Sequence, residues 1–353
     1  MFKKKNFLFT LLLLLIVAVL TACGGGSTEG TTSSGSNGES SESSGEARTL
    51  RISLGLNDQH PLYHSSMKFK ELVESQTDTL KVEVYHSGQI ADDRSAIEML
   101  QFGTLEITIP SSAPFVSFVP EYGVFDLPFT LTSTEMVDAI LQGEFGENLA
   151  AKTEAQGIVQ LAWWENGFRQ LTNDTKPINT LEDLKGLKIR VMENEMHIDT
   201  WKALGTNPTP MAFTELFTAM QQKTVDGQEN PYPSILLEKY PEVQKYLTET
   251  NHVYSPFLFL VSKKIWDELS AEQQEIIRSA AIEAGEYNRE LTRQTANEAL
   301  EELKGQMEFT KISDEELERF KEAVKPVIEQ YKDQVGTEIV EQYLSEIENF
   351  SNK

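Results

Sequence analysis

Cysteine is almost missing from this sequence, since Cys23 is the only one among 353 residues. A single cysteine excludes an internal disulfide. Cationic residues are also scarce: 31 Lys and Arg stand against 55 Asp and Glu, a net charge of −24. Nucleic-acid binding needs clustered cations to neutralise phosphates, so this composition argues against it. It does not argue against an anionic ligand, because a few inward-facing arginines can dominate the potential inside a cleft.

The motifs of common catalytic sites are missing as well. The sequence has no HExxH, no GxSxG, no P-loop and no local pattern that pairs a nucleophile with a base. His60 and His64 are four residues apart and could flank a metal ion, but no third ligand is apparent, so packing at a helix start is favoured. We therefore expect no enzyme, no metal site and no cofactor; turnover of an organic acid by the purified protein would reverse that expectation.

One long apolar run stands near the N-terminus, from Phe7 to Leu20, after three lysines at positions 3–5. A basic start followed by a short apolar run indicates a secretory signal peptide over residues 1–22 rather than a membrane-spanning helix. The ending Leu20-Thr21-Ala22-Cys23 resembles the lipobox of bacterial lipoproteins, so Cys23 is expected to carry a lipid anchor on the outer face of the membrane. The alternative is an ordinary signal peptide with an incidental cysteine.

The stretch after this cysteine is made almost entirely of Gly, Ser, Thr, Asn and Glu, up to about residue 47. Such a composition cannot bury a core, so residues 23–47 are expected to form a lipid-anchored flexible tether. About 305 residues remain, more than a single hydrophobic core usually holds. We therefore expect two lobes.

Arg190 is the residue on which the functional interpretation depends. Leu187, Ile189 and Val191 alternate with Lys188 and Arg190, the period-two pattern of a strand. The arginine thus points to one defined face, where its planar guanidinium suits a carboxylate ligand. A structural salt bridge is the equally weighted alternative, because buried ion pairs account for many arginines on strands.

The residues that follow indicate a βαβα unit. A helix closes at Gly205, an extended Pro208–Met211 segment follows, and a second helical pattern runs over Phe213–Met220. Open sheets of this kind bind ligands beyond the carboxyl ends of their strands, which is where Arg190 and Asn230 fall.

Trp164 precedes Glu165-Asn166-Gly167 and offers a flat apolar wall for a ligand, with core packing as the favoured alternative.

Several motifs together resemble one transport family. They are GLKIRVM at residues 186–192, PTPM with the following Phe and Glu-Leu at 208–216, VDGQENP at 225–231, GFRQLTN at 167–173 and SGQIADDR at 87–94. This set resembles the solute-binding subunit of tripartite ATP-independent periplasmic (TRAP) transporters, of the dicarboxylate-binding DctP type. The likeness covers essentially the whole chain after about residue 48, with the motifs in the family's order.

The resemblance implies an α/β fold like that of periplasmic binding proteins. Two lobes, each a central sheet flanked by helices, are joined by hinge strands, and one long helix runs along both lobes. The expected division is residues 48–167 plus 256–295 for the first lobe and 168–255 plus 296–353 for the second. The proline-free helical pattern over Ala271–Gly305 fits the long helix.

The resemblance also implies roles for individual residues. Arg190 makes the principal salt bridge to the ligand carboxylate, Arg169 is an auxiliary cation, and Asn230 donates to the same group. Asn57, at the end of the first strand, is expected to add a polar contact, and Arg94 a secondary one.

Phe213 is expected to cover the ligand, and Trp164 completes the list of candidate contacts.

The function that the resemblance implies is that of an extracytoplasmic receptor, expected to be a monomer. It closes around an organic acid and delivers it to a sodium-coupled TRAP permease in the membrane. C4-dicarboxylates and sugar acids such as hexuronates both fit. The alternative is a protein of the same fold that presents its ligand to a membrane sensor kinase.

Overall fold

The computed structural model describes residues 47–352, which belong to one compact unit of the chain. The predicted signal peptide, Cys23 and residues 24–46 of the tether lie outside this range. None of the helices within residues 47–352 combines the length and the apolarity that a membrane crossing needs.

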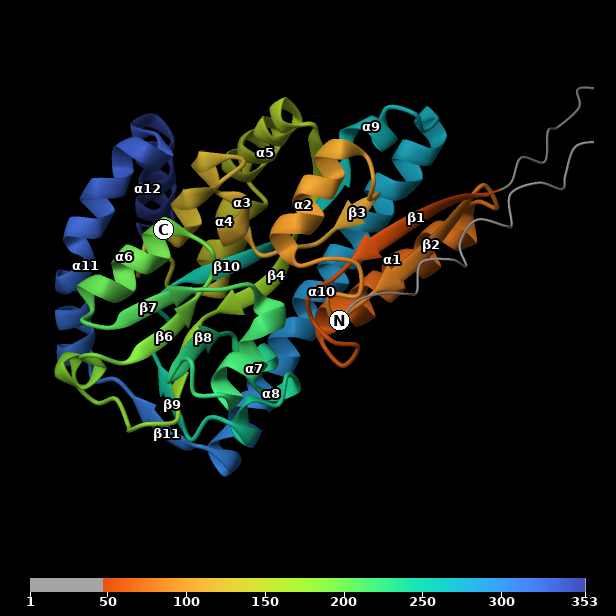
Figure 1. Ribbon diagram of the computed structural model, residues 1–353. Coiled ribbons are helices and arrows are strands. Elements are labelled where there is room, and N and C mark those ends of the chain that lie inside the picture. The colour runs from red at the N-terminus through yellow and green to blue at the C-terminus, as the bar shows by residue number, and fades with distance from the viewer. Residues whose placement is uncertain (1–46, 353) are drawn as a thin grey trace, which may run out of the picture. The chain divides into compact units, whose positions relative to one another are not determined.

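The first sheet has five strands in the order β2-β1-β3-β10-β4 (Figure 1). Its first three strands are parallel, whereas β10 is antiparallel to both of its neighbours. All nine residues of β10 are buried, which suits a strand inside the sheet and explains its apolar sequence. The strands are β1 (Arg48–Ser53), β2 (Leu80–Tyr85), β3 (Ile107–Thr108), β4 (Ile158–Phe168) and β10 (Tyr254–Ser262).

The second sheet has six strands in the order β11-β9-β5-β8-β6-β7. β6 is parallel to β7 and to β8, which confirms the predicted βαβα unit, while β5 is antiparallel to β8 and β9. The strands are β5 (Gln170–Asn173), β6 (Lys188–Val191), β7 (Asn207–Pro210), β8 (Gly227–Asn230), β9 (Tyr246–Glu249) and β11 (Glu308–Lys311).

The chain passes between the two sheets twice within short distances along the sequence. Only Arg169 separates β4 of the first sheet from β5 of the second, and residues 250–253 separate β9 from β10. β4 and β10 pair with each other over nearly their whole length (Figure 1). The two connections therefore lie side by side, as expected of hinge strands.

Helices cover both sheets. They are α1 (Pro61–Gln76), α2 (Asp93–Phe102), α3 (Ser112–Phe115), α4 (Thr134–Leu141), α5 (Glu144–Ala151), α6 (Glu195–Ala203), α7 (Leu216–Gln221), α8 (Tyr232–Leu237), α9 (Lys263–Trp266), α10 (Ala271–Gln306), α11 (Asp314–Val335) and α12 (Thr337–Ser351), with 3-10 turns η1 (Pro120–Asp126), η2 (Lys152–Gln156), η3 (Leu181–Leu184), η4 (Phe213–Glu215) and η5 (Tyr240–Glu242).

The long helix is α10, with 36 residues, and its presence confirms the prediction. Ser270 and Gln273 form a capping box at its start. α10 packs against α1 and β4 beside the first sheet and against α8 and β11 beside the second. It therefore runs along both halves of the fold.

The C-terminal region forms two helices. Gly336, with φ of +114°, separates α11 from α12, because this backbone conformation is rarely open to other residues. α12, which the predicted division assigns to the second lobe, packs against α4 and α5 beside the first sheet. Val340 and Tyr343 of α12 are fully buried in that core.

Candidate ligand-binding site

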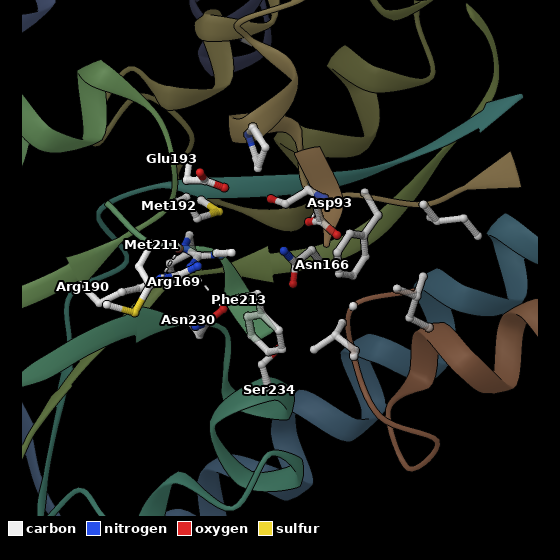
Figure 2. Close-up of a pocket in the computed structure, with 18 residues that line it drawn as sticks. Asp93, Asn166, Arg169, Arg190, Met192, Glu193, Met211, Phe213, Asn230 and Ser234 are labelled. Atoms are coloured by element: carbon white, nitrogen blue, oxygen red, sulfur yellow. Dashed lines mark hydrogen bonds between the residues drawn. The ribbon is translucent and has the colours of Figure 1, made fainter. Parts of the chain in front are cut away.

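A cavity with about 580 Å³ of empty space, part of it open to solvent, lies where elements of the two sheets face each other (Figure 2). Its first side comes from the segment after β1, the start of α2, the segment after β3 and the end of β4. Its second side comes from β6, η4 and the end of β8. The lining includes four of the predicted contacts, namely Arg169, Arg190, Phe213 and Asn230. Ligand sites of α/β proteins usually lie at such carboxyl ends of strands.

Arg190 is buried at this cavity without a carboxylate partner. It stands on β6, its residue is 2% exposed, and its Nε donates to the Met211 carbonyl oxygen at 2.9 Å. Its Nη1 is buried and has no hydrogen-bond partner among residues 47–352, where no ion pair involves this residue either. Burial lowers the pKa of Arg190 from its ordinary value, but a guanidinium stays charged at neutral pH. The structure thus presents an uncompensated cation beside a cavity, which favours ligand capture over the salt-bridge alternative.

Arg169 also lines the cavity, but its charge is already matched. It forms an ion pair with Glu229 of β8, and both side chains are almost fully buried. Its Nη2 donates to Glu229 Oε1 at 3.0 Å and to Asn230 Oδ1 at 3.1 Å. The antiparallel register of β5 and β8 sets Gln170 opposite Asn230 and so brings these residues together.

His252 completes this buried cluster, with Nε2 at 3.0 Å from Glu229 Oε2. Burial lowers the pKa of His252, and Glu229 opposes that change only in part, so the ring is mostly neutral at pH 7. Burial alone would raise the pKa of Glu229, but the charge of Arg169 and the contact with His252 outweigh it and lower that pKa. Arg169 and Glu229 therefore form a neutral pair.

Asn230 and Phe213 are brought to the cavity as predicted. Asn230 is buried at the end of β8, where its Oδ1 accepts from Arg169 and its Nδ2 donates to Gln228. The half-buried Phe213, in η4, turns its ring toward the middle of the cavity (Figure 2). Arg190 and Asn230 reach one edge because β6 and β8 are parallel neighbours.

Trp164 is placed in the core rather than at the cavity. Its side chain is 1% exposed, its Nε1 donates to the Ala281 carbonyl oxygen of α10 at 3.0 Å, and its ring lies 5.3 Å from that of Phe259. The register between β4 and β10 shifts at Asn166, and this bulge breaks the alternation, so Trp164 packs against α10 while Asn166, two positions later, lines the cavity. The packing alternative accounts for Trp164.

Asn57 and Arg94 also lie outside the lining. Asn57 Nδ2 donates to the Leu237 carbonyl oxygen at 2.8 Å and its backbone N–H donates to Glu238 Oε1 at 2.8 Å, so it joins the segment after β1 to the end of α8. Arg94 is exposed and forms an ion pair with Glu98 at 3.5 Å. It lines a different hollow, of about 1,210 Å³, together with residues of α3, α6 and α11.

Sequence reasoning missed four polar residues at the cavity: Asp93, Asn166, Glu193 and Ser234. Acids in the first turn of a helix complement its dipole, which by itself explains neighbouring acids at positions 92 and 93. In the structure Asp92 is the N-cap, because its Oδ1 accepts from the Ser95 N–H at 3.0 Å. One side chain suffices for this cap. The second acid beside it was therefore the sequence signal that Asp93 has a role other than capping.

Burial raises the pKa of Asp93 from 3.8 to about 6, with Asp92 and Glu193 adding to the rise and the Ser111 N–H and Arg190 opposing it. In the unfolded chain this carboxyl ionises near its ordinary value, whereas in the folded protein it stays protonated up to about pH 6. The folded state is therefore penalised progressively as pH rises from about 4 to 6, and the penalty is constant above that.

Replacing Asp93 with asparagine removes this penalty. We expect the unfolding free energy of Asp93→Asn, relative to the natural protein, to rise by about 1–3 kcal/mol between pH 4 and pH 7.5. Urea denaturation at both pH values measures it, with Glu98→Gln on the same helix as the control. A difference that does not change with pH would contradict the placement of Asp93.

The site offers capture of an anion rather than catalysis. No group of three or more metal-ligating side chains is found within the part of the chain that the structure describes. Arg190 and the neutral Arg169–Glu229 pair face a cavity that also carries acceptor oxygens and the Phe213 ring. Such a surface suits a small organic anion with polar substituents.

Comparison with known proteins gives this site its context. The model of the bacterial extracellular solute-binding proteins, family 7, matches residues 52–334. The sugar acid binding protein DctPAm from Advenella mimigardefordensis, solved in complex with galactonate, is 42% identical; the match covers 86% of this chain and 99% of that one, with a TM-score of 0.85. A TRAP periplasmic solute binding protein from Polaromonas sp. JS666, bound to D-erythronate, is 36% identical over 84% of this chain and 98% of that one, with a TM-score of 0.80.

A further relative is the C4-dicarboxylate-binding periplasmic protein DctP of Rhodobacter capsulatus, 34% identical over 79% of this chain and 85% of its own length. The chain therefore belongs to family 7 of the bacterial extracellular solute-binding proteins, the solute-binding proteins of TRAP transporters. This confirms the resemblance and the fold class predicted from the sequence. The family serves transport and is not a family of enzymes.

Proposed function

We propose that this chain is an extracytoplasmic receptor that captures an organic acid anion through Arg190 and delivers it to a sodium-coupled TRAP permease. The observation that carries the proposal is the buried Arg190 guanidinium at the cavity, whose Nη1 has no hydrogen-bond partner within residues 47–352. A buried cation without a partner is costly, and a bound carboxylate removes that cost. Relatives named for galactonate, D-erythronate and C4-dicarboxylates support the ligand class.

The predicted contacts to the ligand that line the cavity all belong to the second lobe. Arg190 binds the carboxylate, Asn230 donates to the same group with its remaining amide hydrogen, and Phe213 covers the ligand. Arg169 acts through Asn230, whose amide oxygen it fixes, rather than as a second free charge. Asn57, Arg94 and Trp164 are left out of the binding set because their side chains contact other parts of the protein.

Capture proceeds by closure of the two lobes about the connections near Arg169 and residues 250–253. The contacts of Asn57 with α8, and of Asn194 with the Ala113 carbonyl oxygen at 3.1 Å and Asp126 Oδ2 at 2.9 Å, join first-lobe and second-lobe segments and hold the closed state. A ligand favours closure only by binding that state better. The permease subunits then recognise the closed receptor, which the Cys23 lipid keeps at the membrane as a monomer.

A thermal-shift screen tests the proposal. Galactonate, galacturonate, succinate and a neutral hexose are added to the purified protein at concentrations up to 10 mM. A ligand at about a hundredfold excess over its dissociation constant adds roughly 2.7 kcal/mol to the stability of the folded state. We expect at least one acid to raise the melting temperature by several degrees and the hexose to have no effect. A screen in which no organic acid raises it would refute the proposed function.

A further inference from the structure

The charges around the cavity are matched to one carboxylate and not to two. Among the described lining residues, Arg190 is the only cation that no acid neutralises, since Arg169 is paired with Glu229. Two acids, Asp93 and Glu193, line the same cavity, and neither forms an ion pair within residues 47–352. A first carboxylate of the ligand neutralises Arg190. A second one has no free cation to bind and adds a negative charge near two others.

Asp93 lies apart from the arginines across the cavity. In Figure 2, Arg190 and Arg169 stand on one side, and Asp93 and Asn166 stand on the other. A ligand whose carboxylate binds Arg190 therefore turns its other end toward Asp93.

Within the part of the chain that the structure describes, two oxygen atoms at that other end lack a hydrogen-bond donor. Asn166 is 4% exposed, and its Oδ1 is buried with no hydrogen-bond partner in the described range. Asp93 accepts from the Ser111 N–H through Oδ2 at 3.4 Å, while its Oδ1 receives no hydrogen bond from residues 47–352. Carboxylate and amide oxygens accept hydrogen bonds and cannot donate them. A ligand hydroxyl supplies the missing hydrogen, whereas a ligand carboxylate brings only further acceptors.

We propose that the ligand is a hydroxylated monocarboxylate of the sugar-acid class, and that Asp93 selects it by accepting a hydroxyl hydrogen bond and repelling a second carboxylate. This inference rests on the proposed function, in which Arg190 anchors the first carboxylate. C4-dicarboxylates and sugar acids present the same carboxylate to Arg190, so Arg190 alone does not discriminate between them. Asp93 provides the discrimination.

Galactonate and galactarate give a matched test, because they share carbon chain and hydroxyls and differ only at C6, where galactarate has a carboxylate in place of the CH₂OH group. Hexanoate serves as a monocarboxylate without hydroxyls. Isothermal titration at pH 7.5 measures the dissociation constants of all three ligands for the natural protein, for Asp93→Asn and for Glu98→Gln. The last variant removes one acid from the same helix without altering the cavity lining.

We expect the natural protein and Glu98→Gln to bind galactonate at least about tenfold more tightly than galactarate or hexanoate, since juxtaposed like charges and unpaired acceptors each cost that much or more. In Asp93→Asn the preference for galactonate over galactarate falls by about tenfold or more, because the amide can donate to the second carboxylate. Galactarate binding as tightly as galactonate, or an unchanged preference in Asp93→Asn, overturns the inference and leaves the proposed function standing. Failure of every carboxylate to bind overturns the proposed function itself.

Discussion

Arg190→Ala is expected to weaken binding of the preferred organic acid by about 3–5 kcal/mol, a loss of a few hundredfold to a few thousandfold in affinity. The guanidinium is buried, its Nη1 has no partner in the described part of the chain, and its only hydrogen bond there runs from Nε to the Met211 carbonyl oxygen. The ligand carboxylate would lose its charge partner inside a desolvated cavity. Isothermal titration of the natural protein and the variant measures the change.

Arg94→Ala is the matched control for this experiment. Arg94 is an exposed arginine with the same charge, and it lies outside the cavity lining. We expect its removal to change the affinity by less than about tenfold, because exposed ion pairs contribute little. The unliganded Arg190→Ala protein should be at least as stable as the natural one, since the substitution removes an uncompensated buried cation. A loss in affinity below tenfold for Arg190→Ala would show that this residue does not bind the ligand carboxylate.

Glu229→Ala is expected to have the largest effect on stability, lowering the free energy of unfolding by about 3–5 kcal/mol. The carboxylate of Glu229 neutralises Arg169, and both side chains are almost fully buried. Its loss leaves Arg169 as an unpaired buried charge beside His252, which burial keeps mostly neutral. Urea denaturation measures the change, and the melting temperature should fall by on the order of 10 °C.

Two further variants separate this charge effect from a general loss of packing. Glu182→Ala breaks the exposed ion pair with Arg319 and should leave the free energy of unfolding almost unchanged. The double variant Arg169→Met with Glu229→Met removes both charges and should recover much of the stability lost in Glu229→Ala. If Glu229→Ala costs less than about 1 kcal/mol, or the double variant is no more stable than the single one, the neutral buried pair is refuted.

The βαβα unit, the long helix and the position of Arg190 were predictable because they depend on local patterns. Alternation along residues 187–191 fixed the face of Arg190, and the βαβα order placed it with Asn230 at the carboxyl ends of two strands. The proline-free helical pattern located α10 to within about a residue at each end. Each of these signals spans fewer than fifty residues, a length over which residue propensity and periodicity are informative.

The charge balance of the site was not predictable, because it depends on pairings across long stretches of sequence. Arg169 meets Glu229 only through the register of β5 and β8, 60 residues apart, so the sequence alone left it as a second free cation. Asn57 finds its partner 180 residues away, at the end of α8. The orientation of Trp164 toward α10 likewise depends on a contact 117 residues distant.

The central claim is that Arg190 receives the carboxylate of the ligand. A crystal structure of the protein with galactonate tests it most directly. A ligand carboxylate oxygen should lie about 2.7–2.9 Å from Arg190 Nη1, the ordinary length of a charge-assisted hydrogen bond, with the ligand hydroxyls turned toward Asp93 and Asn166. Galactonate bound with its carboxylate away from Arg190, leaving Nη1 still without a partner, would contradict the account.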